Sequence, residues 1–227
     1  VFLGCILAGV VPIAANTLLT TKDFEFMLRD SRAQALFVSQ PLLPAFEGLA
    51  DQIPSLRHVF VAGASGAGTV TELVEEGAST AWVAPTSCDD ACFWLYSSGS
   101  TGTPKGTVHL HSHLIQTAEL YGRAVLGIRE DDVVYSAAKL FFAYGLGNAL
   151  TFPLAVGATT VLLPSRPTPA DVFGILQKHQ PTIFYGVPTL FAAMLASPAL
   201  PARDAVALRV ATSAGEALPE HVGRKFA

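Results

Sequence analysis

Short apolar segments alternate along this chain with longer segments that have helical periodicity and helix-capping residues. We expect strands at residues 10–14, 35–38, 56–61, 92–96, 107–110, 133–136, 159–163, 182–185 and 208–213. We expect helices at residues 2–8, 22–31, 112–126, 145–155, 169–179, 189–196 and 218–227. Thr21 and Thr168 are the expected caps of two of them, with Pro169 at a first helical position. This alternation predicts an α/β fold of layered sheets and helices with largely parallel strands.

Residues 127–132, which end in a charged turn at 129–132, mark the best internal boundary. We therefore expect one α/β subdomain at residues 1–128 and a second at residues 129–227. The first fifteen residues are almost wholly apolar, but they lack an initiating Met and a basic leader, and Pro12 interrupts them. They are also shorter than the roughly 20 residues that span a bilayer. A buried helix that runs into a strand fits better, so we expect no membrane anchor and an internal fragment that is incomplete at both ends.

The charge balance excludes two broad classes of protein. With 51% hydrophobic and 14% charged residues, the chain is too apolar for intrinsic disorder. A net charge of −4 offers no basic excess for nucleic-acid phosphates. Cys5, Cys88 and Cys92 lack the partners of a zinc site, so we expect reduced thiols in a cytoplasmic protein.

One segment concentrates groups that bind phosphate. Residues 96–106 read Tyr-Ser-Ser-Gly-Ser-Thr-Gly-Thr-Pro-Lys-Gly, with three glycines, five hydroxyl side chains, one lysine and no acidic residue. Glycines let backbone N–H groups surround an anion, and Lys105 adds a positive charge. The spacing matches neither the P-loop nor the dinucleotide fingerprint. A flexible linker is the alternative, but a Pro-Lys-Gly ending between two expected strands is not typical of one.

Three segments together resemble the adenylate-forming superfamily, which includes acyl-CoA synthetases, peptide-synthetase adenylation domains and luciferases. Residues 97–106 resemble its phosphate-binding signature. Residues 141–145, Phe-Phe-Ala-Tyr-Gly, resemble the aromatic segment that lines its acyl pocket. Residues 213–219, Ser-Ala-Gly-Glu-Ala-Leu-Pro, resemble the turn that contacts adenine and forms the floor of the acyl pocket. The resemblance covers essentially the whole chain, which corresponds to part of the large N-terminal domain. Within the superfamily, residues 142–148 and 213–219 are most similar to those of benzoate-CoA ligases and their hydroxybenzoate relatives.

The resemblance implies a two-step reaction with ATP, Mg²⁺ and coenzyme A. A small aromatic carboxylate attacks the α-phosphate of ATP, and the coenzyme A thiol then displaces AMP from the acyl-adenylate. The residues it assigns to the phosphates are Ser97, Ser98, Gly99, Ser100, Thr101, Gly102 and Lys105. The residues it assigns to adenine are Ser213, Ala214, Gly215, Glu216 and Ala217, and those assigned to the acyl pocket are Ala143, Tyr144 and Gly145.

No catalytic residue or metal ligand is assigned within the chain. The superfamily's ribose-binding, metal-binding and lysine-bearing segments and its C-terminal domain have no counterpart here, so we expect residues 1–227 alone to be inactive. A hydroxybenzoate, other aryl or medium-chain acyl-CoA ligase is the nearest alternative. A pseudo-enzyme that only holds nucleotide is a second alternative, and the oligomeric state stays open.

Several single residues have competing interpretations. Glu216 either lies along adenine or caps a helix that begins near residue 218. Phe141 and Phe142 either line the pocket or belong to the core. Alternation places His109, His111 and His113 on one face, but a helix onset near Ser112 argues against a metal site. We expect two acidic pairs to be solvated turns: Glu75 with Glu76, and Asp131 with Asp132.

Overall fold

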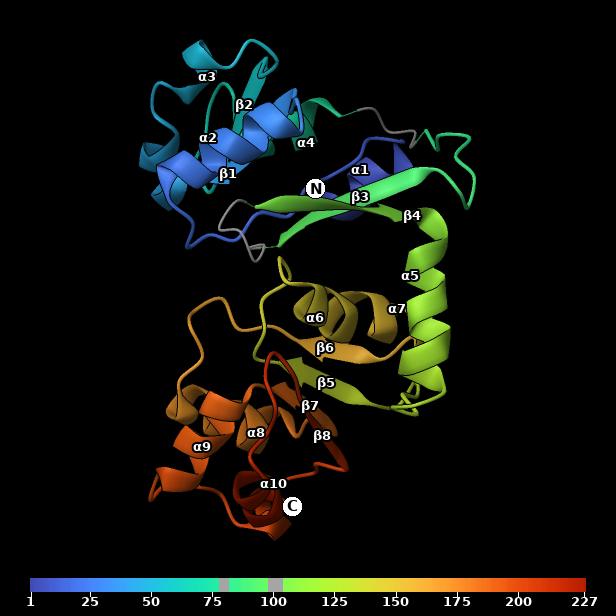
Figure 1. Cartoon of the computed structure of the whole chain (residues 1–227), viewed down its shortest axis with the longest axis vertical. Helices are drawn as coiled ribbons and strands as arrows, with labels where there is room; N and C mark the ends of the chain where they lie inside the picture. The colour runs from blue at the N-terminus through green and yellow to red at the C-terminus, as the bar shows by residue number, and fades with distance from the viewer. Residues whose placement is uncertain (78–81, 98–103) are drawn as a thin grey trace. The chain divides into compact units, whose positions relative to one another are not determined.

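The structure is a computed structural model that describes residues 1–77, 82–97 and 104–227. The chain divides into two compact units, Val1–His111 and Ser112–Ala227. Both units combine helices with strands (Figure 1), so the predicted mixed α/β fold is confirmed. No helix in these three stretches is both long and apolar enough to cross a membrane.

The elements of the first unit follow the expected alternation. In order they are α1 (Phe2–Leu7), α2 (Thr21–Asp30), β1 (Ala35–Ser39), the 3₁₀ helix η1 (Gln40–Phe46), α3 (Leu49–Gln52), β2 (His58–Ala62), α4 (Val70–Glu76), β3 (Ala91–Ser97) and β4 (Lys105–Leu110). Strands β1 and β2 pair in parallel. The buried side chains of α2 pack with those of α3 and the segment after it, namely Phe24, Leu28, Leu49, Ile53 and Leu56.

Strands β3 and β4 form a separate antiparallel pair. Parallel strands need a crossover of about a dozen residues or more, and the short connection between β3 and β4 leaves only the antiparallel arrangement. The predicted phosphate-binding segment is therefore the connection of a hairpin.

The second unit is built on a four-stranded parallel sheet in the order β6-β5-β7-β8. Its elements begin at the unit boundary and are α5 (His111–Thr117), the π-helix η2 (Ala118–Arg123), β5 (Val133–Ser136), α6 (Ala143–Leu146), the π-helix η3 (Gly147–Thr151), α7 (Phe152–Val156), β6 (Thr159–Val161), α8 (Pro169–His179), β7 (Ile183–Gly186), α9 (Pro188–Ala196), the 3₁₀ helix η4 (Arg203–Ala205), β8 (Val210–Ser213) and α10 (Glu220–Phe226).

Alternate side chains of the central strands enter two different cores. On β5, Val134 packs in a cluster with Phe152 of α7, whereas its neighbour Tyr135 packs with α8 and α9. On β7, Phe184 packs in the cluster with α8 and α9, whereas Ile183 packs in the cluster with Val134 and Phe152. Because successive strand residues point to opposite faces, the sheet is the middle layer of three.

The boundary between the two units lies at residues 111–112, earlier in the chain than the predicted boundary at residues 128–129. The segment of α5 and η2 contributes Ala118, and the residues after it contribute Leu126 and Ile128, to the cluster around Val134. This burial ties the helix to the second unit although it precedes residue 129 in the chain.

Most element boundaries agree with expectation, and the differences have local causes. The cap of α2 is Thr20, not Thr21, because the Thr20 side chain accepts the Asp23 N–H while the Asp23 carboxylate accepts the Thr20 N–H. The Thr168 cap and Pro169 start of α8 are confirmed. The expected strand at residues 10–14 is wrong: only Ile13 makes a bridge, to Trp94, and Pro12 lacks the N–H that a ladder needs. The helices η1, α3 and α4 were not predicted.

Candidate active site

The predicted phosphate-binding segment is described only at its ends. Ser97 is the last residue of β3 and Lys105 is the first of β4, and the two are cross-strand partners. Both residues are exposed, so the Lys105 ammonium is available to a ligand beside the Ser97 hydroxyl. The other phosphate-binding candidates lie outside the described residues: Ser98, Gly99, Ser100, Thr101 and Gly102.

In the second unit, the predicted acyl-pocket segment contacts the strand that leads into the predicted adenine turn, at the carboxyl edge of the sheet. Helix α6 follows β5, and β8 leads directly into the predicted adenine turn. The Tyr144 Oη and Thr212 Oγ1 atoms lie 2.7 Å apart and share a hydrogen bond. The Tyr144 ring also packs edge-to-face on Tyr185 of β7, with centroids 6.3 Å apart. Ligands of open parallel sheets bind outside the carboxyl ends of the strands, so this is the expected place for a site.

Gly145 explains how the chain can turn so closely at this point. A Cβ atom on Gly145 would lie 2.1 Å from the Lys139 carbonyl oxygen and 2.6 Å from that of Ala138. No other residue fits, because real side chains do not approach backbone atoms this closely. Gly145 is buried and Ala143 is exposed at the start of α6, so Ala143 is the one of the two that can border a ligand.

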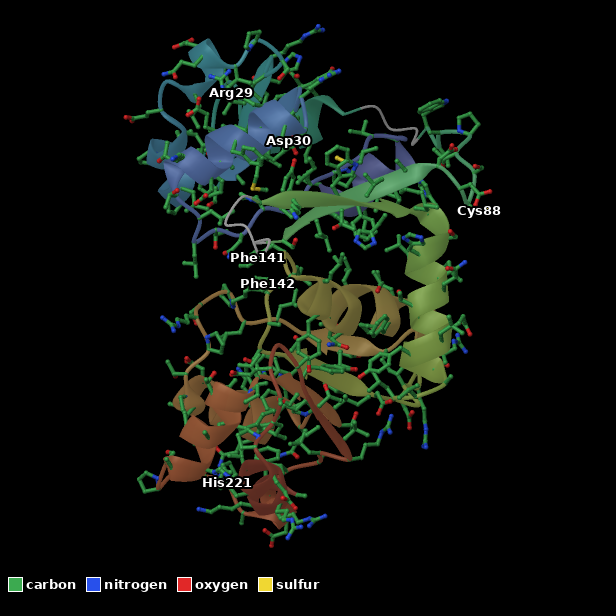
Figure 2. All side chains as sticks on the ribbon, in the orientation of Figure 1. Arg29, Asp30, Cys88, Phe141, Phe142 and His221 are labelled. Atoms are coloured by element: carbon green, nitrogen blue, oxygen red, sulfur yellow. The ribbon has the colours of Figure 1, made fainter. Side chains whose placement is uncertain are left out.

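The two phenylalanines ahead of α6 differ in their exposure. Phe142 is 47% exposed, Phe141 is half-buried, and their ring centroids lie 4.6 Å apart. Figure 2 shows both on the loop that leads into α6. The interpretation of Phe142 as an ordinary buried core residue is therefore wrong.

Lys139 braces the start of this loop, a role that the sequence analysis missed. Its Nζ donates hydrogen bonds to the carbonyl oxygens of Leu163 and Ser165, which follow β6. Burial lowers the pKa of Lys139. The ammonium thus joins the loop before α6 to the segment after β6, and no local pattern signals that contact.

The predicted adenine turn begins where β8 ends. Ser213 is the last residue of β8, and its Oγ is buried without a hydrogen-bond partner among the described residues. Gly215 adopts a φ of +94°, a left-handed conformation that favours glycine. Glu216 is exposed, and α10 begins later, at Glu220, with no side-chain hydrogen bond at its cap position. The alternative in which Glu216 caps this helix is therefore wrong.

A second buried hydroxyl lies on the neighbouring strand. The Tyr185 Oη has no hydrogen-bond partner in the described part of the chain, and burial raises the pKa of this phenol. A buried polar atom without a partner costs free energy, so its presence calls for an explanation, of which a functional role is one. The sequence analysis did not single out Thr212 and Tyr185, which both contact Tyr144. The available signal was a hydroxyl side chain near the end of an otherwise apolar strand.

The two acidic pairs and the three histidines that the sequence singles out are not among the candidate site residues. Asp132 is not a solvated turn residue, because its side chain is only 4% exposed and pairs with Arg209. Glu75 and Glu76 are exposed but belong to α4. The predicted helix onset after β4 is confirmed, since α5 begins at His111 and breaks the alternation of the three histidines.

Comparison with known proteins agrees with this architecture. The family model of the AMP-binding enzymes matches residues 1–227, so the chain belongs to that family. Two of its most similar curated relatives are CoA ligases of benzoate or hydroxybenzoate. The chain is 63% identical over 225 residues to the benzoate–CoA ligase of Thauera aromatica, and 48% identical over 229 residues to the 4-hydroxybenzoate–CoA/benzoate–CoA ligase of Rhodopseudomonas palustris.

Two solved structures have the same fold. A benzoate–CoA ligase from Burkholderia xenovorans matches with a TM-score of 0.89 and 52% identity over 99% of this chain. An anthranilate–CoA ligase in complex with anthranoyl-AMP matches with a TM-score of 0.93 and 38% identity over 99% of this chain. This chain covers 44% of each of those two chains, and it spans 43% and 42% of the Thauera and Rhodopseudomonas proteins. The structural neighbours confirm the predicted adenylate-forming fold.

Proposed function

We propose that the protein containing this chain uses ATP to convert a small aromatic carboxylate, benzoate or a close analogue, into its coenzyme A thioester. The observation that carries the proposal is the 63% identity with the Thauera benzoate–CoA ligase, which extends over 99% of this chain and includes all three site segments. Membership of the AMP-binding family supports the nucleotide half of the reaction.

The reaction has two balanced steps. In the first, a carboxylate oxygen attacks the α-phosphorus of ATP, the bond to the β-phosphate oxygen breaks, and pyrophosphate leaves. In the second, the coenzyme A sulfur attacks the acyl carbon, the thiol proton is lost, and AMP leaves. Negative charge grows on the departing pyrophosphate in the first step, and positioned donors stabilise such charge. Ser97 and Lys105, side by side at the ends of the predicted phosphate-binding segment, are donors of the required kind.

The ring of the carboxylate is assigned to the surface around α6. Ala143 leaves space beside the ring, while Tyr144, fixed by Thr212 and Tyr185, supplies a rigid aromatic wall. Aromatic walls and small residues suit a flat, short substrate better than an extended fatty chain.

ATP enters such reactions with Mg²⁺. The residues described here contain no group of three His, Cys, Asp or Glu side chains close enough to hold a metal ion. We therefore assign no Mg²⁺ ligand within the chain and derive no step through the ion.

The test is substrate profiling of the full-length protein with benzoate, 4-hydroxybenzoate, 2-aminobenzoate and octanoate. Carboxylate-dependent exchange of pyrophosphate into ATP measures the first step, and chromatography of the thioester measures the second. We expect benzoate to have the highest kcat/KM, with lower values for the substituted benzoates. Octanoate as the best substrate would remove the aryl assignment. ATP binding without exchange for any carboxylate would leave a nucleotide-binding pseudo-enzyme.

A further inference from the structure

The hairpin that carries the predicted phosphate-binding segment is held from outside by a helix distant in sequence. The Tyr96 hydroxyl, at the end of β3, donates a 2.6 Å hydrogen bond to Oδ2 of Asp30. Asp30 is the last residue of α2, 66 positions earlier in the chain. Figure 2 labels Asp30 at this end of α2.

Helix stability does not explain an aspartate at this position. The C-terminal end of a helix carries partial negative charge, so a carboxylate there is unfavourable. Asp30 is exposed, and the one hydrogen bond described for its side chain comes from the Tyr96 hydroxyl. Helix α2 is itself firmly anchored, by the Thr20 capping box at its start and by the buried side chains Phe24, Met27 and Leu28. Asp30 therefore fixes Tyr96 to a rigid support.

Tyr96 in turn covers the other strand of the hairpin. Its cross-strand partner is Gly106. A Cβ atom on Gly106 would lie 3.1 Å from Cζ of Tyr96 and 3.0 Å from Cε3 of Trp94. The two aromatic rings thus lie close against the backbone of Gly106, and a larger residue at this position would require the rings to shift.

The next cross-strand pair is Ser97 with Lys105. Successive strand residues point to opposite faces. Ser97 and Lys105 therefore share the face opposite Tyr96, and the aromatic cover leaves them accessible. Burial raises the pKa of Tyr96 and the neighbouring Asp30 carboxylate raises it further, so the phenol remains a proton donor at neutral pH.

We propose that Asp30 and Tyr96 are positioning residues that hold Ser97 and Lys105 in the geometry that receives the phosphates of ATP. Asp30 orients the Tyr96 ring, and the ring restrains the backbone at Gly106. The adjacent cross-strand pair, Ser97 with Lys105, is aligned as a consequence. This inference rests on the proposed function for the identity of the ligand, but it concerns residues outside the phosphate-binding signature.

The experiment uses the full-length protein with Tyr96→Phe, Asp30→Ala and Asp30→Asn. Tyr96→Phe keeps the ring and removes only the hydroxyl. Asp30→Asn keeps an oxygen that can accept the same hydrogen bond. Asp89→Asn is the matched control, because Asp89 is an exposed aspartate of the same unit, outside the predicted site. Binding of ATP with Mg²⁺ is measured by calorimetry without any carboxylate, and KM values for ATP and benzoate are measured separately.

We expect Tyr96→Phe and Asp30→Ala to weaken ATP binding by about tenfold, the loss of one hydrogen bond to a charged group. Asp30→Asn should stay within about threefold of the wild type, and the KM for benzoate should hardly change. Wild-type ATP affinity in Tyr96→Phe and Asp30→Ala, or an equal loss for ATP and benzoate, would overturn the proposal. If the wild type binds ATP but activates no aromatic acid, the proposed function fails while the binding measurement still decides this inference.

Discussion

The Tyr144 hydroxyl and the Thr212 hydroxyl share a 2.7 Å hydrogen bond across 68 positions of sequence. The bond joins α6, which carries the predicted acyl-pocket segment, to β8, which leads into the predicted adenine turn. One segment would recognise the carboxylic acid and the other the adenine of the nucleotide. The hydrogen bond therefore links the two segments within one unit.

The first prediction concerns this bond. In the full-length enzyme, Tyr144→Phe and Thr212→Val should each lower kcat/KM for benzoate by about three- to tenfold, the range of one neutral hydrogen bond. Because both substitutions remove the same interaction, the double variant should be little worse than either single one. The measurement is a double-mutant cycle on kcat/KM, and fully additive effects would contradict the link.

The second prediction concerns the size of the ring pocket. Ala143→Leu should reduce kcat/KM for substituted benzoates more than for benzoate, because the larger side chain occupies the space of a ring substituent. One methylene changes discrimination by only about 1–3 kcal/mol, so the shift in the ratio should be modest. Ala207→Leu is the matched control, since Ala207 is an exposed alanine before β8. Unchanged ratios in Ala143→Leu would place the ring elsewhere.

The third prediction concerns the phosphate-binding segment. Lys105→Ala and Gly102→Val should each slow benzoate-dependent pyrophosphate exchange by about 10²–10³ if the lost donors act in the transition state. Lys178→Ala, at an exposed lysine near the end of α8, should leave the exchange rate unchanged. A normal rate in Gly102→Val would refute the assignment of this segment to the phosphates.

The fourth prediction concerns stability and its pH dependence. Asp132 accepts hydrogen bonds from Thr182 Oγ1 at 2.6 Å and Arg209 Nε at 2.9 Å. Burial by itself raises the pKa of Asp132, but the bonds from Arg209, Thr182 and the Arg129 N–H outweigh it and lower the pKa to about 2. Asp132→Asn should therefore lower the free energy of unfolding by about 3 kcal/mol at neutral pH.

The sign of the pH effect follows from the lowered pKa. An aspartate titrates near pH 3.9 in an unfolded chain, so the stabilising contribution is complete well above that value and disappears as the pH falls towards 2. The difference between wild type and Asp132→Asn, measured by urea unfolding at several pH values, should shrink over this acidic range. Asp131→Asn, at the exposed neighbour, is the control and should show little difference at any pH. A difference in unfolding free energy that does not change with pH would contradict the stabilising role of the ionised Asp132 carboxylate.

Local patterns were sufficient for much of the fold. The capping box of α8 and the apolar strand β7 depend on residues within a few positions of one another, so the sequence predicts them closely. The predicted phosphate-binding segment is also a local pattern, because its glycines, hydroxyls and lysine are contiguous, and its role stays a prediction. Even local prediction fails where neighbours compete: Thr20 and Thr21 are equally good caps by type, and only the reach of the Thr20 side chain to the Asp23 N–H selects between them.

Tertiary structure alone decided the environment of individual polar groups. Asp132 lies in a charged turn by sequence, yet folding buries its carboxylate and brings Arg209 to it from 77 positions away. The partners of Tyr144 and Tyr96 are likewise 68 and 66 positions distant. The sequence by itself determined most of the elements and indicated the chemistry of the contiguous segments, because periodicity, capping and motifs act over a few residues. Which hydroxyls and carboxylates meet was settled only when the strands paired and the helices packed on them, because burial and long-range hydrogen bonds exist only in the folded chain.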